Sequence, residues 1–197
     1  MTDKRLIKTD DIKKAADEKK CPLERALFYM TEFLAGPMCG KCFPCSMGSY
    51  EARVILNNMI EGKAAEEDLS KLRRIASDML DGSMCKKGKD TARFMLQWLD
   101  TGDFDRHVEG ICPERTCGAY IEYTIITAKC TMCGECLTAC KYGAIYGEKR
   151  RAFISGYQPF EIRQTKCVKC GECVPACPEK AIAVVDAKVK EAETVGT

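Results

Sequence analysis

The chain has 197 residues, of which 46% are hydrophobic and 30% are charged, and its formal net charge is +2. This length suits one or two small domains, and the near balance of charge argues against the strongly basic face of a nucleic-acid-binding protein. No apolar run approaches the roughly 18 residues of a membrane-spanning helix, and the N-terminal residues lack the apolar segment of a secretory signal. We therefore expect no membrane insertion and no nucleic-acid partner.

The first half of the chain predicts helices. Thr9 and the two aspartates after it could cap a short helix, and Pro22 stands where a helix prefers its first residue. Apolar residues then recur at helical spacing, with Asp68 and Asp90 as candidate starts of the last two helices. The expected helices cover about residues 9–19, 22–35, 45–61, 68–81 and 90–101. Residues 21–102 therefore predict a small helical bundle.

Cysteine is the most informative residue type, with fifteen copies. A Cys-x-x-Cys-x-x-Cys run wraps the backbone around a cubane cluster and directs three thiolates at its irons, while a fourth cysteine completes the site. The chain has three such triplets, and each predicts one [4Fe–4S] cluster. The triplets are Cys39, Cys42 and Cys45; Cys130, Cys133 and Cys136; and Cys167, Cys170 and Cys173.

The second half of the chain contains an internal repeat with a period of 37 residues. Residues 130–145 align without a gap on residues 167–182, and nine of the sixteen positions are identical. A β-rich segment precedes the repeat at 120–127, and residues 153–162 between its halves could form a hairpin. A repeat of this kind predicts two similar sites in one small domain.

Disulfides and zinc are the two alternative uses for these cysteines. A disulfide framework is typical of small secreted domains, but the triplets repeat too regularly for it. A zinc ribbon separates two CxxC pairs by a longer spacer than the spacing found here, and a zinc-rich binding module would be colourless. Iron–sulfur clusters are the preferred interpretation, and thiolate ligands with oxygen-sensitive clusters indicate a reducing cytoplasm.

The repeat resembles bacterial two-cluster ferredoxins over residues 119–186. In that family the fourth cysteine of each C-x2-C-x2-C-x3-C run ligates the other cluster. The family proline after that cysteine is present as Pro178 and replaced by Lys141 in the first half. The resemblance implies one cluster on Cys130, Cys133, Cys136 and Cys177, and another on Cys167, Cys170, Cys173 and Cys140.

The first triplet lies in the segment Cys39-Gly-Lys-Cys-Phe-Pro-Cys45. It resembles the Cys-Gly-x-Cys-x-Pro-Cys motif of the cluster domain in NADH-binding flavoprotein subunits of respiratory complex I and of electron-bifurcating hydrogenases. In that family a cysteine about 40 residues later completes a [4Fe–4S] cluster beside the flavin. The resemblance covers about residues 21–102 and implies a cluster on Cys39, Cys42, Cys45 and Cys85. The Glu-Ser and Arg that flank the family motif are replaced here by Pro37-Met38 and Ser46.

Three cysteines and the only histidine remain: Cys21, Cys112, Cys117 and His107. Three thiolates and one imidazole make a closed tetrahedral set, which suits structural zinc. The hydrogenase flavin subunits carry a similar group of residues. We expect these four side chains to bind one Zn²⁺ at the joint between the two modules; the alternative is a surface histidine with incidental thiols.

The expected fold class is α+β: a helical bundle that holds one [4Fe–4S] cluster, followed by a two-[4Fe–4S] ferredoxin-like domain. No dinucleotide-binding or phosphate-loop motif is present and no residue set forms a catalytic site, so we expect electron transfer without bond-making by the chain itself. The expected organisation is a polar extension (1–20), the bundle (21–102), a joint (103–118), the ferredoxin-like domain (119–186) and a tail (187–197).

The resemblances imply an iron–sulfur subunit of a cytoplasmic, NAD(P)-linked flavoprotein complex, of the electron-bifurcating type. Such a subunit relays electrons between the flavin of a partner and ferredoxin or another redox subunit. The flavin- and NAD(P)-binding part would then be a separate chain. The alternative is a stand-alone polyferredoxin that carries electrons without a stable partner.

Overall fold

The computed structural model describes residues 8–149 and 160–187. The chain divides into two compact units, with the boundary between Tyr120 and Ile121. We call residues 8–120 the helical unit and residues 121–187 the repeat unit, and each is described by itself. The helix-rich first unit and the two small sheets of the second confirm the α+β class. Among the described helices, none combines the length and the apolar character that crossing a membrane requires.

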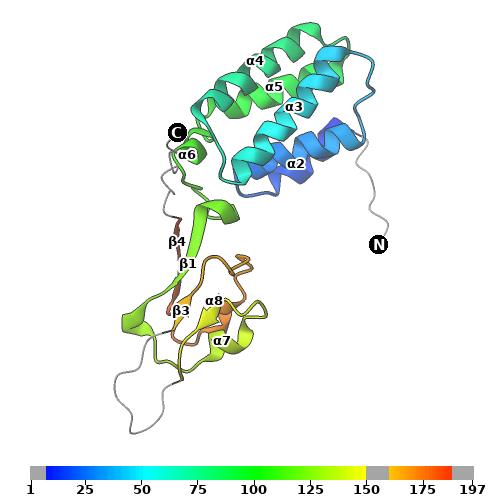
Figure 1. Ribbon diagram of the computed structural model, residues 1–197. Helices are drawn as coiled ribbons and strands as arrows, with labels where there is room; N and C mark the ends of the chain where they lie inside the picture. The colour runs from blue at the N-terminus through cyan, green and yellow to red at the C-terminus, as the bar shows by residue number, and fades with distance from the viewer. Residues whose placement is uncertain (1–7, 150–159, 188–197) are drawn as a thin grey trace. The chain divides into compact units, whose positions relative to one another are not determined.

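The helical unit consists of helices that pack in sequence order. Neighbours along the chain lie against each other from α1 to α5, and α2 also contacts α5 (Figure 1). Apolar faces of these helices form one continuous core, in which the ring centroids of Phe94 and Trp98 lie 3.8 Å apart. The helices are α1 (Thr9–Asp17), α2 (Pro22–Ala35), α3 (Phe43–Ile60), α4 (Glu66–Gly82), α5 (Lys86–Asp100) and α6 (Asp105–Val108), followed by the 3-10 turn η1 (Gly118–Tyr120).

The starts of α4 and α5 differ from the sequence-based prediction. Helix α4 begins at Glu66 rather than Asp68, because the Asp68 carboxylate reaches back and accepts a hydrogen bond from the backbone N–H of Ala65 at 3.0 Å. Helix α5 begins at Lys86, with Cys85 as its N-cap. Asp90 is therefore inside α5, and the prediction that it caps the helix is wrong.

Two glycines allow α3 and α4 to approach closely. A β-carbon added to Gly48 on α3 would lie 2.7 Å from Cγ of Met79, and one added to Gly82 on α4 would lie 2.7 Å from Cγ of Pro44. Both distances are shorter than a carbon–carbon contact, so only glycine leaves room for the neighbouring helix. This close approach brings the N-terminal turn of α3 and the C-terminal end of α4 together.

The repeat unit combines two antiparallel strand pairs with short helices. Strand β1 pairs with β4, with Tyr123 opposite Val184, and β2 pairs with β3, with Ile145 opposite Ile162. Of the expected hairpin at 153–162, only its last residues are described, since 153–159 lie outside the described ranges. The elements are β1 (Ile121–Ile125), η2 (Thr127–Lys129), α7 (Glu135–Ala139), β2 (Ile145–Tyr146), β3 (Glu161–Ile162), α8 (Cys173–Ala176) and β4 (Ile182–Asp186).

The sequence repeat is also a repeat of backbone conformation. Gly134 and Gly171, which occupy equivalent positions, both have left-handed backbone angles, with φ of +81° and +76°. The residues two positions earlier, Met132 and Lys169, also have positive φ (58° and 61°) although they carry side chains. Non-glycine residues adopt this conformation rarely, so the two cysteine loops share a specific and costly shape.

Candidate iron–sulfur and metal centres

The first candidate centre lies in the helical unit, where four cysteines come from two helix starts. Cys42 is the N-cap of α3 and Cys85 is the N-cap of α5, while Cys45 lies in the first turn of α3. We call Cys39, Cys42, Cys45 and Cys85 the helical-unit set. Cys42 and Cys45 are buried, whereas Cys39 and Cys85 are exposed, so the set opens at the surface of this unit.

The electrostatics of the helical-unit set show that its thiols lie close together. Burial raises the pKa of the Cys45 thiol to about 11, and the neighbouring thiols of Cys42 and Cys85 contribute to that rise. Four thiolates around a cluster carry net negative charge, which helix N-termini stabilise. Neither α3 nor α5 has an acidic residue in its first turn. The donor set and the two helix starts therefore fit a [4Fe–4S] cluster.

The second candidate centre lies around Cys136 in the repeat unit. Cys136 is on α7 and buried, and burial raises the pKa of its thiol. The thiols of Cys130, Cys177 and Cys133 add to that rise. We call these four cysteines the first repeat set. Cys177 comes from the other half of the repeat, as the ferredoxin resemblance implies.

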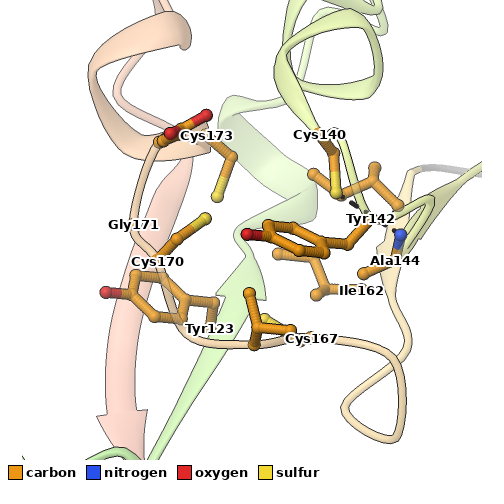
Figure 2. Close-up of a pocket in the computed structure, with 12 residues that line it drawn as sticks. Tyr123, Cys140, Tyr142, Ala144, Ile162, Cys167, Cys170, Gly171 and Cys173 are labelled. Atoms are coloured by element: carbon orange, nitrogen blue, oxygen red, sulfur yellow. Dashed lines mark hydrogen bonds between the residues drawn. The ribbon is translucent and has the colours of Figure 1, made fainter.

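The third candidate centre is a pocket lined by Cys167, Cys170, Cys173 and Cys140, which we call the second repeat set. The loop that carries the triplet curls around one side of the pocket, and Cys140 reaches it from a different segment (Figure 2). Tyr123 and Tyr142 also line this pocket, and no sequence motif identified them. Burial and the neighbouring thiols raise the pKa of Cys173 to about 11.

The two fourth cysteines of the repeat have equivalent surroundings. The backbone N–H of Ala144 donates to Cys140 Sγ at 3.4 Å, and the N–H of Ala181 donates to Cys177 Sγ at 3.3 Å. Burial opposes ionisation of Cys140, but the N–H groups around it outweigh that effect and lower its pKa. These donors favour a thiolate at Cys140, which is the state that ligates iron.

The fourth group is the set of Cys21, His107, Cys112 and Cys117, which we call the histidine set. All four side chains are buried, and their ligand atoms lie within 4.8 Å of one another. Cys21 is the N-cap of α2 and His107 belongs to α6, so the set joins the start of α2 to the segment after α5. Tyr120 packs edge-on against the His107 ring at 5.1 Å and donates a hydrogen bond to the Met59 carbonyl.

The distances from Cys21 to the other three donors of the histidine set are close to the edges of a single tetrahedron. Sγ of Cys21 lies 3.3 Å from His107 Nε2, 3.5 Å from Cys117 Sγ and 4.0 Å from Cys112 Sγ. A tetrahedral zinc with Zn–S of about 2.3 Å and Zn–N of about 2.0–2.1 Å has ligand edges of about 3.6–3.8 Å. All fifteen cysteines, each within the described residues, are free thiols, so these short distances are not disulfides. The donor set and the geometry fit one zinc ion.

Contacts within the histidine set shift the pKa values of His107, Cys112 and Cys117. Burial opposes a charged His107, but hydrogen bonds to the thiols of Cys112 and Cys21 prevail and raise the pKa of His107 to about 9. Hydrogen bonds from Cys117 and Cys21 lower the pKa of Cys112, and the same network raises the pKa of Cys117. Binding of a metal ion by these four side chains would release the protons that they share.

Two family matches cover most of the chain. Residues 25–109 match the NADH-ubiquinone oxidoreductase-F iron-sulfur binding region, and residues 129–182 match the 4Fe-4S dicluster domain. The chain therefore contains two iron–sulfur regions that bind 4Fe–4S clusters, and its resemblance to the iron–sulfur part of NADH-linked flavoprotein subunits is confirmed. Cys21 precedes the first matched region, and Cys112 and Cys117 lie between the two.

Individual relatives agree with this assignment. The chain is 35% identical over 138 residues to the NADP-reducing hydrogenase subunit HndC of Solidesulfovibrio fructosivorans, a match that covers 68% of this chain and 28% of that protein. It is 35% identical over 100 residues to a subunit of the NADH-quinone oxidoreductase of Streptomyces coelicolor, covering 49% and 22%. It is 40% identical over 68 residues to the NADP(+)-dependent formate dehydrogenase subunit beta of Moorella thermoacetica, covering 33% and 9%. The chain spans less than a third of each of these proteins.

Proposed function

We propose that the chain is the iron–sulfur electron-transfer part of an NAD(P)-linked flavoprotein oxidoreductase complex, with three [4Fe–4S] clusters held by the helical-unit set and the two repeat sets. The observation that supports the proposal is the pocket that Cys167, Cys170 and Cys173 line together with Cys140, which comes from the other half of the repeat. Bound clusters would supply one-electron redox chemistry. The chain would hold them and set their surroundings.

The surface near the helical-unit set supports a protein partner. Phe43, which follows Cys42, is 76% exposed, and Met84, which precedes Cys85, is 84% exposed. Three further apolar side chains on α3 are also exposed: Met47, Tyr50 and Val54. Large apolar side chains gathered at the surface are typical of interaction sites. We propose that this face meets a flavin-binding partner and that Cys39 and Cys85 mark the point of electron exchange.

The repeat unit would exchange electrons with ferredoxin or with another redox subunit. The relatives named above are subunits of NADP-reducing hydrogenase, NADH-quinone oxidoreductase and NADP(+)-dependent formate dehydrogenase. Their shared feature is a nicotinamide substrate and a second redox substrate that differs among them. We accordingly propose coupling of a nicotinamide to a further redox partner, of the flavin-based bifurcating type.

The test is electron delivery through the purified native complex under anaerobic conditions. NAD(P)H should reduce iron–sulfur clusters of this chain in the presence of its flavoprotein partner. In the Cys85→Ala variant, the repeat-unit clusters should still accept electrons from dithionite but no longer from NAD(P)H, because the helical-unit set is incomplete. A chain that purifies alone, or a Cys85→Ala complex that still transfers electrons from NAD(P)H to the repeat unit, would contradict the proposal.

We also propose that the histidine set binds one zinc ion. Four buried donors at tetrahedral spacing, with three thiols and one imidazole, support zinc rather than a cluster, because cubane ligands lie farther apart. Zinc would then join the start of α2 to α6 and to the segment that follows it. Its role would be structural, since all four positions are filled by the protein.

A further inference from the structure

Two buried serine hydroxyls lie beside the helical-unit set without a hydrogen-bond partner among the described residues. Ser49 is 0% exposed and Ser83 is 3% exposed, and the hydroxyl oxygen of each is unpaired. Buried hydroxyls are almost always hydrogen-bonded, because leaving one unpaired in the interior is unfavourable. Two such groups close to one candidate cluster need a physical explanation.

Ser49 shares a helix face with Cys45. It lies four residues after Cys45 on α3, so the two side chains are neighbours one turn apart. The hydroxyl is therefore placed to donate to the Cys45 sulfur once that sulfur carries negative charge.

Ser83 reaches the same sulfur from the end of α4. A β-carbon added to Gly88, in the first turn of α5, would lie 2.7 Å from Ser83 Oγ and 3.1 Å from Cys45 Sγ. A methyl group at Gly88 would therefore contact both atoms, so Ser83 Oγ and Cys45 Sγ lie around the same small space, which glycine leaves empty. Ser49, on α3, and Ser83, the C-cap of α4, thus lie near Cys45 on different elements.

We propose that Ser49 and Ser83 are positioning residues that donate O–H···S hydrogen bonds to the Cys45 thiolate and its cluster. This inference rests on the proposed ligand set. Hydrogen bonds to cluster sulfur favour the reduced, more negative state and therefore raise the reduction potential. The two serines would raise the potential of the helical-unit cluster and leave those of the repeat unit unchanged.

The test is an EPR-monitored redox titration of the full chain, purified anaerobically with its clusters. Ser49→Ala and Ser83→Ala should each shift the midpoint of the helical-unit cluster to lower potential. In the double variant, the ratio of reduced to oxidised cluster at a fixed potential should fall by about tenfold, which is 59 mV for a one-electron couple. The repeat-unit clusters serve as internal references in every sample.

Ser46→Ala is the matched control. Its hydroxyl is on the same helix, next to Cys45, but donates to the backbone carbonyls of Cys42 and Phe43, both at 3.2 Å. It should leave the midpoint unchanged, and Ser49→Thr should retain it because the hydroxyl is kept. A shift in Ser46→Ala as large as in Ser49→Ala would overturn the inference.

The remaining outcomes separate this inference from the proposed function. Wild-type protein with about eight irons per chain would overturn the ligand set, and this inference with it. About twelve irons with an unchanged midpoint in both alanine variants would overturn the role of the serines alone. If both alanine variants lose the cluster, retention in the matching threonine variants supports the hydroxyl role, and loss there overturns it.

Discussion

At the scale of single residues, a short distance between a sulfur and a nitrogen distinguishes the histidine set, proposed to bind zinc, from the three cysteine sets proposed to bind clusters. Sγ of Cys21 and Nε2 of His107 are 3.3 Å apart, which leaves room for one ion between them. The sequence suggested this group because three cysteines and one histidine remained after the cluster motifs were assigned. It did not reveal that residues 86 positions apart meet, since that depends on how α2 and α6 pack.

Removing one ligand of the histidine set should remove zinc and leave iron unchanged. His107→Ala should lower the zinc content of the protein from about one per chain to none, because three thiolates no longer close the tetrahedron. The melting temperature should fall, since α2 and α6 lose their link. Elemental analysis and thermal melting measure both effects. Cys39→Ala is the control and should lower iron alone; iron-rich wild-type protein without zinc would contradict the site.

The crossed ligands of the repeat can be tested by combining substitutions. Cys177→Ala should lower iron by about four atoms per chain, because it completes the first repeat set. Adding Cys130→Ala should cause no further loss, since both residues serve the same cluster. Adding Cys167→Ala instead should raise the loss to about eight. The reverse result, with Cys177 and Cys167 acting on one cluster, would show that the ligands do not cross.

At the scale of helices and strands, hydrophobic spacing predicted the helices well and their starts less well. The periodicity of α2 to α5 is a local property, so the helical segments could be found from the sequence. The start of α5 was assigned to Asp90 because aspartate is a favourable N-cap. The structure begins the helix at Lys86. Cys85 is the N-cap by position and its side chain makes no capping hydrogen bond, so a candidate ligand stands where a capping residue is usual.

Replacing Gly88, in the first turn of α5, by alanine tests how closely this helix must approach Cys45. Alanine favours a helix interior by about 1 kcal/mol over glycine. Here the added carbon would meet Ser83 Oγ at 2.7 Å and Cys45 Sγ at 3.1 Å, and steric repulsion should prevail. Gly88→Ala should therefore lower iron by about four atoms per chain and reduce the melting temperature. Lys87→Ala, an exposed change in the same turn, should do neither; full iron content in Gly88→Ala would contradict this packing.

At the scale of the whole molecule, the two units differ in the size of their hydrophobic cores and in how much of each core is cysteine. The helical unit has a large core that includes Tyr29, Phe33, Phe94 and Trp98. In the repeat unit the core is small, and cysteines form much of it: Cys136 is buried there and five others pack against it. Small domains of this kind need cross-links in place of a larger core. Composition and repeat pattern change near residue 119, and that change is the feature of the sequence that predicts a boundary there.

Iron removal should therefore unfold one unit and spare the other. In iron-free protein, amide hydrogens of β1 and β4 should exchange freely, while those of α2 to α5 should stay protected. Hydrogen exchange read by mass spectrometry reports each segment separately. Removal of zinc alone serves as the control and should affect the surroundings of α6 without exposing β1. Persistent protection of the β1–β4 pair in iron-free protein would show that its small core suffices.

If ligands are exchanged between the repeat halves as proposed, that exchange would also set the order in which the sites are completed during protein synthesis. All proposed ligands of the helical-unit set have been translated once Cys85 is added, so that centre can mature while the ribosome still works. The first half of the repeat supplies three proposed ligands first, but their set is complete only after Cys177 has been translated. The set that includes Cys140 is complete only after the loop that ends at Cys173 has been translated. Both proposed repeat centres would thus become complete within a few residues of each other, at Cys173 and Cys177, and a ribosome stalled before that point would present incomplete sets of thiols.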